Sequence, residues 1–549
     1  MTACRHINVI LPLKLEWEPF YLVPEGVSVA VGDRVRVPFA GRNYLGVVSA
    51  VDAEVPPSVG RVLEIYGVDG TKNTILPTEI QFWRMVADYY MCTVGEVYKA
   101  AYPSVKDETV SARRKEEAFV PMADGVNLSE TSGTLAIEAE ELLGKGKPLL
   151  VRTPHEDVLM SLCLHNASRN ILWLVPEKKL EKTLLSTLEA VFGSRLLVWD
   201  SGLTPARRRA VLHRMREGTS YILFGTRSAL FLPHRDLGLI VVQDEQDQSY
   251  KQTSPSPRYN GRDAAVMLSS VFGSKVVLQS ASPSLETLQN CISGKYLSVR
   301  KEVSSVRCEI VDIGAELKKN GMCGDIPKLV RSADCSCAGP LFFYKPRRAA
   351  FPRLEELQEQ TSRFFSGRDA HGPVPCVSED LLACPVPEGT GTLVVFGIDS
   401  MLGRADFRAD ERAWQTVVQA LAKAPASLRS VIVLTREPGH PVFAALHGGD
   451  PSFLLPERKE YGYPPFSRIV DVLVKDSFPD RQHRILSSLC RTIQGAALGN
   501  ALPMADRVRV FLPRDRRLLF SKRRLCSIVG DFERASRYPS HITFDVDPL

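Results

Sequence analysis

The stretch Leu237-Gly-Leu-Ile-Val-Val-Gln-Asp-Glu-Gln-Asp247 decides the fold class of this chain. A short apolar run rich in β-branched residues passes directly into an acidic segment, which is typical of a buried parallel strand and the turn after it. Amphipathic stretches separate most of the runs of the same kind around it, which are Pro148–Val151, Ile171–Val175, Arg195–Val198, Tyr221–Phe224 and Lys275–Leu278. This alternation predicts a doubly wound α/β lobe over residues 131–295.

Residues 296–450 carry a second and weaker series of this kind. Its candidate strands are Leu341–Tyr344, Thr392–Phe396 and Ser430–Leu434. An irregular insertion rich in Pro and Gly lies between the first two, over about 349–390. We therefore expect a second α/β lobe that is reduced in comparison with the first.

Smaller domains are predicted on both sides of the two lobes. Residues 1–105 begin with short runs such as Ile7–Leu11, interrupted by Gly and Pro, which predicts a compact β-domain. Apolar residues at helical spacing predict a helix over Pro77–Tyr90. Residues 106–130 are polar and charged and predict a linker, whereas residues 451–549 predict an α+β domain whose last strand is Ile542–Val546.

The composition is that of a globular protein. The chain has 549 residues, of which 44% are hydrophobic and 24% charged, and these values exclude a disordered chain. Most of the 12 cysteines stand alone in apolar runs, which favours buried thiols in a reducing compartment. The sequence contains neither a signal peptide nor an apolar run of membrane-spanning length. We therefore expect a cytoplasmic protein.

The charge is only mildly basic. The net charge is +6, from 69 basic and 63 acidic residues, which by itself does not indicate nucleic-acid binding. One local cluster stands out, and a solvated face and a binding surface explain it equally well. It contains Arg507, Arg509, Arg514, Arg516, Arg517, Lys522, Arg523 and Arg524, and only Asp506 and Asp515 interrupt it.

Several strings of residues, in a fixed order along the chain, resemble one family. In the first lobe they are Leu174–Glu177, Phe224–Phe231, Leu237–Asp247, Ser249–Gln252, Pro257–Asp263 and Ser280–Ser284. Before it they are Leu11–Leu13, Tyr21–Gly26, Gly32–Phe39 and Gly46–Val48, and after it Asp406–Arg412, Glu437–Val442, Glu457–Arg458, Tyr463–Phe466 and Asp545–Pro548. Together they resemble the PriA family of bacterial replication-restart helicases over roughly four-fifths of the chain. The resemblance implies two helicase-type lobes and an N-terminal domain that captures the 3′ end of a nascent DNA strand.

The chain departs from the family pattern where a phosphate-binding loop would lie. Such a loop needs glycines after a strand and a Lys-Ser/Thr pair. Here the strand Pro148–Val151 runs into Arg152-Thr-Pro-His-Glu-Asp157, which contains none of these. Glu156 and Asp157 would lie at the N-terminus of a helix, where carboxylates repel phosphate.

Two further motifs of the nucleotide site are altered. The family's Asp-Glu-Glu-His falls on Gln243–Gln246, so the carboxylate that positions magnesium is replaced by an amide, and Asp244 and Glu245 are remnants without an expected catalytic role. The family's late arginine motif falls on Gln419–Ala426, in which both arginines are missing. We therefore expect no ATP hydrolysis. The altered motifs also disfavour ATP as a cofactor, but they leave open whether a nucleotide binds without being hydrolysed.

The family's zinc module is also reduced. Paired Cys-x-x-Cys spacing supplies a zinc ion with its ligands, and this chain has no such pair. We expect no bound metal at the candidate cysteines, which are Cys323, Cys335, Cys337, Cys376 and Cys384. The family's winged-helix domain is missing as well, because only the linker occupies its place.

Candidate DNA-binding residues fall in two groups. An aromatic and basic loop, together with Arg227 before it, could stack on bases and follow the phosphate backbone through Tyr250, Lys251, Arg258, Tyr259 and Arg262. In the N-terminal domain the candidates are Tyr21, Arg34, Arg36 and Arg42. The family's aspartate that holds the last base and sugar falls on Phe20, and its aromatic neighbour on Pro19, so reading of a 3′ end would need Glu16 or Glu18 as a substitute.

Three hypotheses about function follow from these patterns. The first is a replication-restart protein that binds forked or branched DNA with a nascent 3′ end and promotes reloading of the replicative helicase without helicase activity of its own. The resemblance implies single-stranded DNA-binding protein and primosome or helicase-loading proteins as its partners. The second is an active 3′-to-5′ DNA helicase with an unusual nucleotide site, and the third is a protein scaffold without DNA binding.

Overall fold

The computed structural model describes residues 5–69, 75–102, 120–177, 182–218, 220–300, 306–330, 341–365, 376–381, 384, 386–402, 406–422, 424–448, 450–535 and 541–549. Most of the predicted linker, residues 106–119, therefore lies outside the described residues. The chain forms two compact units. Unit 1 comprises residues 1–149, 156–278 and 462–549, and unit 2 comprises residues 150–155 and 279–461.

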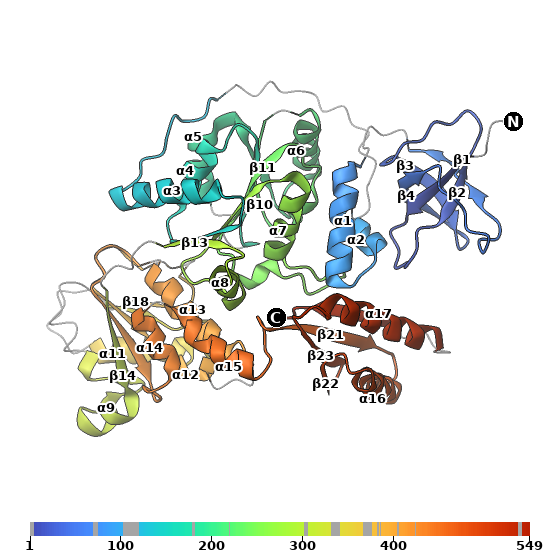
Figure 1. Ribbon diagram of the computed structural model, residues 1–549. Coiled ribbons are helices and arrows are strands. Elements are labelled where there is room, and N and C mark those ends of the chain that lie inside the picture. Colours follow the sequence, from blue (N-terminus) through green and yellow to red (C-terminus); the bar gives the residue numbers. More distant parts are fainter. Residues whose placement is uncertain are drawn as a thin grey trace. The chain divides into compact units, whose positions relative to one another are not determined.

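The N-terminal part of unit 1 is a β-sheet followed by two helices (Figure 1). Its strands lie in the order β5-β2-β1-β4-β3-β6. Alternate residues of β1 and β3, among them Ile7, Val9, Val35 and Val37, are buried in one core, as expected for strands with one face inside. The strands are β1 (Arg5–Ile10), β2 (Phe20–Val23), β3 (Arg34–Phe39), β4 (Arg42–Val51), β5 (Leu63–Glu64) and β6 (Gly67–Val68).

Helices α1 (Pro77–Tyr90) and α2 (Val94–Ala101) follow this sheet, and α1 confirms the predicted helix. Pro77 begins α1, where its missing N–H costs nothing. Glu79 caps the start of the helix, because its carboxylate accepts a hydrogen bond from the Leu76 N–H over 2.9 Å. Met91, in the left-handed region with φ 53°, ends the helix.

A parallel sheet forms the centre of unit 1. Its strands in this unit lie in the order β12-β11-β8-β10-β9. All residues of β8 and β10 are buried, which agrees with the continuous apolar runs from which they were predicted. The strands are β8 (Asn170–Leu174), β9 (Leu196–Trp199), β10 (Ile222–Gly225), β11 (Leu237–Val242) and β12 (Lys275–Gln279), and the helices are α3 (Glu130–Leu143), α4 (Glu156–His165), α5 (Lys182–Phe192), α6 (Pro205–Arg216) and α7 (Gly261–Phe272).

The C-terminal part of unit 1 is an antiparallel sheet with two long helices. Its strands lie in the order β22-β23-β21-β24. They are β21 (Ser467–Lys475), β22 (Asn500–Pro503), β23 (Arg507–Pro513) and β24 (His541–Val546), and the helices are α16 (Pro479–Gly495) and α17 (Leu518–Ala535). Strand β24 confirms the last predicted strand.

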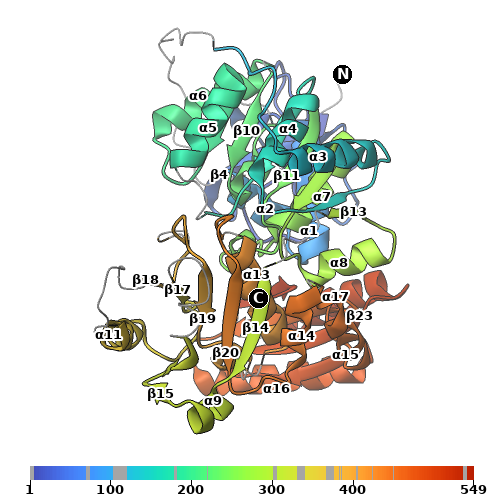
Figure 2. The same cartoon turned by 90° about the vertical axis from the view of Figure 1, so that its left-hand side faces the viewer.

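Unit 2 is the second α/β lobe, with a parallel sheet in the order β14-β20-β19-β17-β18. Along β19 and β20 alternate residues enter separate cores, Leu393 and Val431 in one and Val394 and Ile432 in the other. Figure 2 shows α13 and α14 on one face of this sheet and α11 on the other. The strands are β14 (Arg307–Asp312), β17 (Leu341–Tyr344), β18 (Cys376–Ser378), β19 (Thr392–Val395) and β20 (Ser430–Thr435).

Unit 2 contains further helices and strands. Its helices are α8 (Leu285–Ile292), α9 (Ile313–Lys319), α11 (Leu354–Phe365), α12 (Asp399–Leu402), α13 (Ala409–Ala422), α14 (Pro441–Gly448) and α15 (Leu455–Glu460). Its other strands are β7 (Leu149–Arg152), β13 (Leu297–Arg300), β15 (Met322–Cys323) and β16 (Ile326–Pro327). Sequence patterns did not predict β14, an edge strand with one buried residue, Val311, because partial burial leaves only a weak apolar signal.

The predicted fold class is confirmed, because two α/β lobes with parallel sheets accompany an N-terminal β-rich part and a C-terminal part with an antiparallel sheet. In the part of the chain that is described, no helix has both the length and the apolar character needed to cross a membrane. The predicted domain boundaries remain predictions.

Candidate functional site

Gln243 occupies the end of β11, where the family pattern has its first aspartate. Its side chain is fully buried. The indole N–H of Trp173 donates to Gln243 Oε1 over 3.0 Å, and Gln243 Nε2 donates to Glu156 Oε1 over 2.5 Å. Because an indole can only donate and a carboxylate can only accept, these partners fix the orientation of the amide. A carboxylate at this position could not donate to Glu156 and would repel it.

Glu156 and Asp157 begin helix α4, as predicted. The Asp157 carboxylate accepts a hydrogen bond from the Val158 N–H over 2.8 Å. The unpaired N–H groups of a helix N-terminus attract anions, and here these side chains supply the negative charge. Glu156 accepts a hydrogen bond from Gln243, and residues 153–155 contain neither glycine nor lysine. This region therefore does not fit a nucleotide phosphate with its magnesium ion.

The two remnant acidic residues follow directly. Asp244 has a φ of 48°, in the left-handed region that Asp and Asn tolerate better than most residues. Glu245 is buried, and its Oε2 lies 3.1 Å from Arg262 Nη1. Arg262 also bonds Asp263 through Nε over 2.7 Å, so this predicted DNA-binding arginine is held by two carboxylates of its own lobe.

The two tyrosines of the predicted aromatic loop lie in the interior. Tyr250 is buried, and its hydroxyl lies 2.6 Å from the carbonyl oxygen of Gln243 and 3.0 Å from that of Leu174. Tyr259 is also buried, with its ring 5.1 Å from that of Phe231 in an edge-on arrangement. Both rings therefore pack inside the lobe, and neither presents a face on which an unpaired base could stack.

The basic residues of this loop bind the last strand of unit 1. Lys251 Nζ is almost fully buried and lies 2.7 Å from both Asp545 Oδ1 and the Val546 carbonyl oxygen. Burial raises the pKa of the Asp545 carboxyl, and the nearby ammonium acts in the opposite direction. Arg258 Nη1 donates to Thr543 Oγ1 and to the Phe544 carbonyl oxygen, each over 3.0 Å. The loop therefore joins the parallel sheet of unit 1 to β24.

Arg227 lies beside this loop. Its guanidinium donates to the Ser249 carbonyl oxygen and lies 2.9 Å from Glu177 Oε1. The structure thus brings together Arg227, Tyr250, Lys251, Arg258, Tyr259 and Arg262, but as a network within the protein. DNA binding by these residues remains a prediction.

The candidates of the N-terminal sheet divide by exposure. Tyr21 is buried and donates to the Pro38 carbonyl oxygen over 3.0 Å, and burial raises the pKa of Tyr21 to about 12. Arg34 is buried, with its guanidinium 6.0 Å from the ring centre of Tyr102. Arg36 and Arg42 are exposed and accessible to the phosphates of a DNA backbone, although Arg36 lies 3.7 Å from Asp69.

Glu16 and Glu18, the two proposed substitutes for the family aspartate, also differ in how accessible their carboxylates are. Glu18 is held by Arg84 over 3.0 Å and by the Ser49 hydroxyl. Glu16 is exposed and interacts electrostatically with Arg534, which is itself paired with Asp531 over 2.7 Å. Of the two acidic residues, only Glu16 therefore has a side chain that an incoming group could reach without breaking an ion pair.

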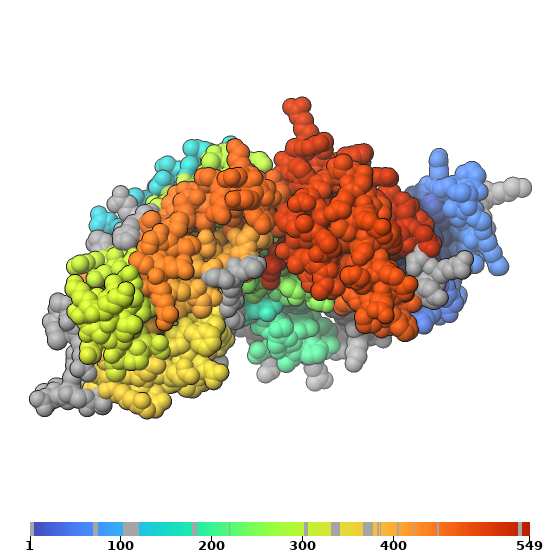
Figure 3. Space-filling model, turned by 90° about the horizontal axis from the view of Figure 1, so that it is seen from below, coloured from blue at the N-terminus to red at the C-terminus, as the bar shows by residue number. Residues whose placement is uncertain are grey.

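The C-terminal basic cluster is partly neutralised by the protein. Arg507 and Arg509 both bind the buried Asp471, and Lys522 donates to the Asp88 carbonyl oxygen over 2.6 Å. Arg517 binds Asp515. Figure 3 shows this C-terminal part of unit 1 as an orange-red surface. Four exposed arginines remain, which we call the basic surface: Arg514, Arg516, Arg523 and Arg524.

Comparison with known proteins adds to this geometry. Residues 8–103 match the family model of the 3′ DNA-binding domain of PriA. The chain is 26% identical over 543 residues to the replication restart protein PriA of Treponema pallidum, covering 80% of this chain and 82% of that protein. The chain is therefore similar in sequence to PriA, and the similarity extends well beyond the matched domain. It is also 28% identical over 332 residues to PriA of Rickettsia conorii, and 34% identical over 223 residues to PriA of Chlamydia trachomatis.

Coverage differs among these PriA proteins. The alignment with the Rickettsia conorii protein includes 58% of this chain and 50% of that protein, and the alignment with the Chlamydia trachomatis protein includes 40% and 27%. The chain thus spans about half the length of the Rickettsia relatives. Among solved structures, the DUF1998 helicase MrfA bound to DNA matches 79% of this chain with 13% identity and a TM-score of 0.37, and RecG bound to a three-way DNA junction matches 70% with 11% and 0.34.

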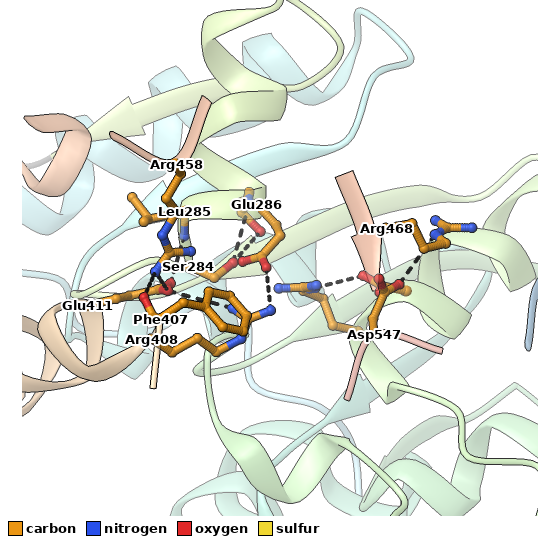
Figure 4. Close-up of polar contacts among 12 residues, drawn as sticks. Ser284, Leu285, Glu286, Phe407, Arg408, Glu411, Arg458, Arg468 and Asp547 are labelled. Atoms are coloured by element: carbon orange, nitrogen blue, oxygen red, sulfur yellow. Dashed lines mark hydrogen bonds and ion pairs between the residues drawn. The ribbon is translucent and has the colours of Figure 1, made fainter. Parts of the chain in front are cut away.

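Two of the strings that resemble PriA, Asp406–Arg412 and Glu457–Arg458, meet in unit 2 beside Leu285 and Glu286 (Figure 4). Glu411, from the string Asp406–Arg412, accepts the Leu285 N–H over 2.9 Å and lies 2.8 Å from Arg458 Nη2. Arg408 binds Glu286 over 2.7 Å. The guanidinium groups of Arg408 and Arg458 lie 4.8 and 5.3 Å from the ring centre of Phe407. These strings contributed to the resemblance, but the sequence predicted no role for their residues.

A second cluster that sequence reasoning missed lies in unit 1. The guanidinium of Arg468 lies 4.0 Å from the ring centre of Tyr89, and its Nε lies 3.6 Å from Asp547 Oδ2 (Figure 4). The PriA-like string Asp545–Pro548 was the available signal, because both of its aspartates bind cations of unit 1.

The structure describes only some of the candidate zinc-binding cysteines. Cys335 and Cys337, and the side chain of Cys376, lie outside the described residues. Among the residues that are described, Cys323 and Cys384 included, no group of three or more His, Cys, Asp or Glu side chains is placed to hold a metal ion.

Proposed function

We propose that this protein binds replication forks, or other branched DNA with a nascent 3′ end, and promotes reloading of the replicative helicase without hydrolysing ATP. The observation that carries the proposal is the hydrogen bond from Gln243 to Glu156 at the end of β11, in a chain whose residues 8–103 match the PriA 3′ DNA-binding domain. The first feature supports the absence of ATP turnover, and the second supports the choice of DNA. The cytoplasm is the proposed compartment.

Exposed arginines are the proposed DNA contacts. Arg36 and Arg42 lie on neighbouring antiparallel strands of the matched domain, and the basic surface adds cations in the C-terminal part of unit 1. Each phosphate neutralised by such a cation releases a counterion, so binding should weaken steeply with salt. The buried members of the aromatic and basic loop, such as Tyr250 and Lys251, would act by holding β24 in place.

The proposed protein partners are single-stranded DNA-binding protein and primosome or helicase-loading proteins. They come from the resemblance to PriA and from the name that its relatives carry. A platform of this kind needs only binding energy, because recruitment at a bound fork raises the local concentration of a loader without any chemical step.

The test is the affinity for a forked DNA with a free nascent 3′ end, compared with the same fork carrying a blocked 3′ end. We expect tighter, salt-dependent binding to the free end, unchanged by ATP, and no ATP turnover in the presence of DNA. Arg42→Ala should reduce the slope of log affinity against log salt by about 0.9. The matched control is Arg5→Ala, because Arg5 is already paired with Asp52 over 2.9 Å.

The two alternatives predict other outcomes. DNA-stimulated ATP hydrolysis that Glu245→Gln abolishes would establish an active helicase. Absence of salt-dependent DNA binding would leave a protein scaffold. Equal affinity for free and blocked ends would retain fork binding but remove 3′-end recognition from the proposal.

A further inference from the structure

A cavity of about 410 Å³ lies within unit 1, and none of the four arginines of the basic surface lines it. The connection from β1 to β2 forms one wall, the end of α1 and the start of α2 form a second, and α17 with β24 form the third. Apolar side chains contribute to its lining, among them Leu13, Met91, Val94, Val529 and Phe544. The cavity can therefore take up an aliphatic side chain.

The ionisable side chains of the cavity are mainly acidic, although the whole chain carries a net charge of +6. Its lining has two cations, Lys14 and Arg84, and an excess of three carboxylates over them: Glu16, Glu18, Asp88, Glu96 and Glu533. Such a surface repels the phosphates of DNA and attracts a cationic ligand.

Both cations are already engaged. Lys14 Nζ lies 2.8 Å from Glu533 Oε1 and donates to the Ile542 carbonyl oxygen over 2.9 Å. Arg84 Nη2 lies 3.0 Å from Glu18 Oε1. The Glu96 carboxylate caps helix α2 through the Thr93 N–H over 2.9 Å. Asp88 lies 3.8 Å from Lys522 Nζ, and the exposed Glu16 interacts electrostatically with Arg534, a cation that already pairs with Asp531.

Trp17 stands next to Glu16 and also lines the cavity. Its relative exposure is 57%, whereas Trp83, Trp173 and Trp414 are fully buried. An indole is the aromatic ring that binds a cation best, and exposing one costs hydrophobic free energy unless a ligand covers it. An exposed indole between carboxylates matches the side chain of arginine or lysine, with its apolar stem and charged end.

We propose that this cavity binds a basic peptide segment of a partner protein. One arginine or lysine of the segment lies over the Trp17 ring with its charge toward Glu16, and a neighbouring aliphatic side chain enters the apolar part of the cavity. The site goes beyond the proposed DNA contacts, because its charge has the opposite sign and the arginines proposed to contact phosphates do not line it. Glu16 is the accessible one of the two candidates for reading a 3′ end, so the two proposals are tested separately.

The probe is a short fluorescein-labelled peptide of alternating arginine and leucine, followed by fluorescence anisotropy with the full chain. The control peptide has glutamate in place of arginine. We expect binding of the basic peptide only, weakened by salt, with Trp17 protected from acrylamide quenching when the peptide is bound. Excess single-stranded DNA with a blocked 3′ end should leave the peptide bound, which separates this site from the proposed function.

Variants locate the site. Trp17→Ala should weaken binding about two- to fivefold, whereas Trp17→Phe, which keeps an aromatic ring, should weaken it less. Glu16→Gln should weaken it about two- to fivefold at low salt. The matched control is Glu138→Gln, an exposed acidic residue of α3 outside the cavity, which should have no effect. Circular dichroism melting verifies that each variant is folded.

The proposal is overturned if the acidic peptide binds as well as the basic one, or if the basic peptide does not bind. It is also overturned if folded Trp17→Ala and Glu16→Gln proteins bind the basic peptide like the unchanged chain, because the peptide would then lie elsewhere.

Discussion

The end of β11 and the loop that follows it lie within a few residues of each other, yet they hold carboxylates in different ways. At the end of β11 a neutral amide, Gln243, donates to Glu156. In the loop a buried ammonium, Lys251, meets Asp545. The first contact uses residues that depart from the PriA pattern, and the second uses residues that match it. A match to a family string therefore does not say whether a side chain faces a ligand or the interior.

Breaking the ion pair between Lys251 and Asp545 should have the largest effect on the free energy of unfolding. Asp545→Asn leaves the Lys251 ammonium buried without its counter-charge, and removing one partner of a buried pair costs about 3–5 kcal/mol. Urea unfolding at neutral pH, followed by circular dichroism, measures the loss. Asp531→Asn, which breaks the exposed pair with Arg534, is the control and should change stability by less than about 0.5 kcal/mol. Equal effects of the two substitutions would mean that burial of the pair adds nothing.

The buried carboxyl of Glu79 sharpens the comparison, because burial favours its protonated form. Burial raises the pKa of Glu79 from 4.5 to about 7, against hydrogen bonds from the Leu76 N–H and the Tyr102 hydroxyl. The folded state holds this proton more tightly than the unfolded chain. The stability it contributes is therefore complete below pH 4.5 and is lost as the pH rises through about 7, a change of about 3 kcal/mol.

Glu79→Gln should remove this part of the pH dependence. The unfolding free energy of the unchanged chain, measured between pH 4.5 and 8, should fall by about 3 kcal/mol relative to the variant. Glu138→Gln, at an exposed position, should follow the unchanged chain throughout. Parallel pH curves for Glu79→Gln and the unchanged chain would mean that Glu79 is ionised in the folded state.

Substitution of Gln243 should change the stability of the protein least. Gln243→Leu keeps the size of the side chain but leaves the Trp173 N–H and Glu156 without the amide, which costs about 1–3 kcal/mol. Thermal unfolding measures the loss, with Gln81→Leu at an exposed position of α1 as the control. Addition of magnesium ATP should leave the melting temperature of the unchanged chain where it is. A rise would show that a nucleotide binds despite Glu156.

The parallel strands of unit 1 and helix α1 could be predicted from the sequence. A strand buried on both faces, such as β8, must be apolar throughout, and the residues of α1 repeat at helical spacing. The edge strand β14 could not, because one buried residue gives no periodic signal. At the site, the helix position of Glu156 was predictable from the run after the preceding strand, but its partner Gln243 lies 87 residues away.

The environment of the aromatic and basic loop could not be predicted for a related reason. Tyrosine, lysine and arginine suit a DNA surface and a hydrogen-bonded interior equally well. Their exposure depends on β24, which is remote in sequence. The string Asp545–Pro548 carried the available signal, since paired aspartates in an apolar strand need cations nearby.

The bond between Lys251 and β24 also has a consequence for protein synthesis. The Val546 carbonyl oxygen that accepts from Lys251 Nζ is added to the chain 295 residues later. Until then the ribosome-bound lobe must keep this lysine hydrated, which requires the 251–258 loop to stay open. A nascent chain stopped before β24 should therefore leave Lys251 and Arg258 without their partners on that strand.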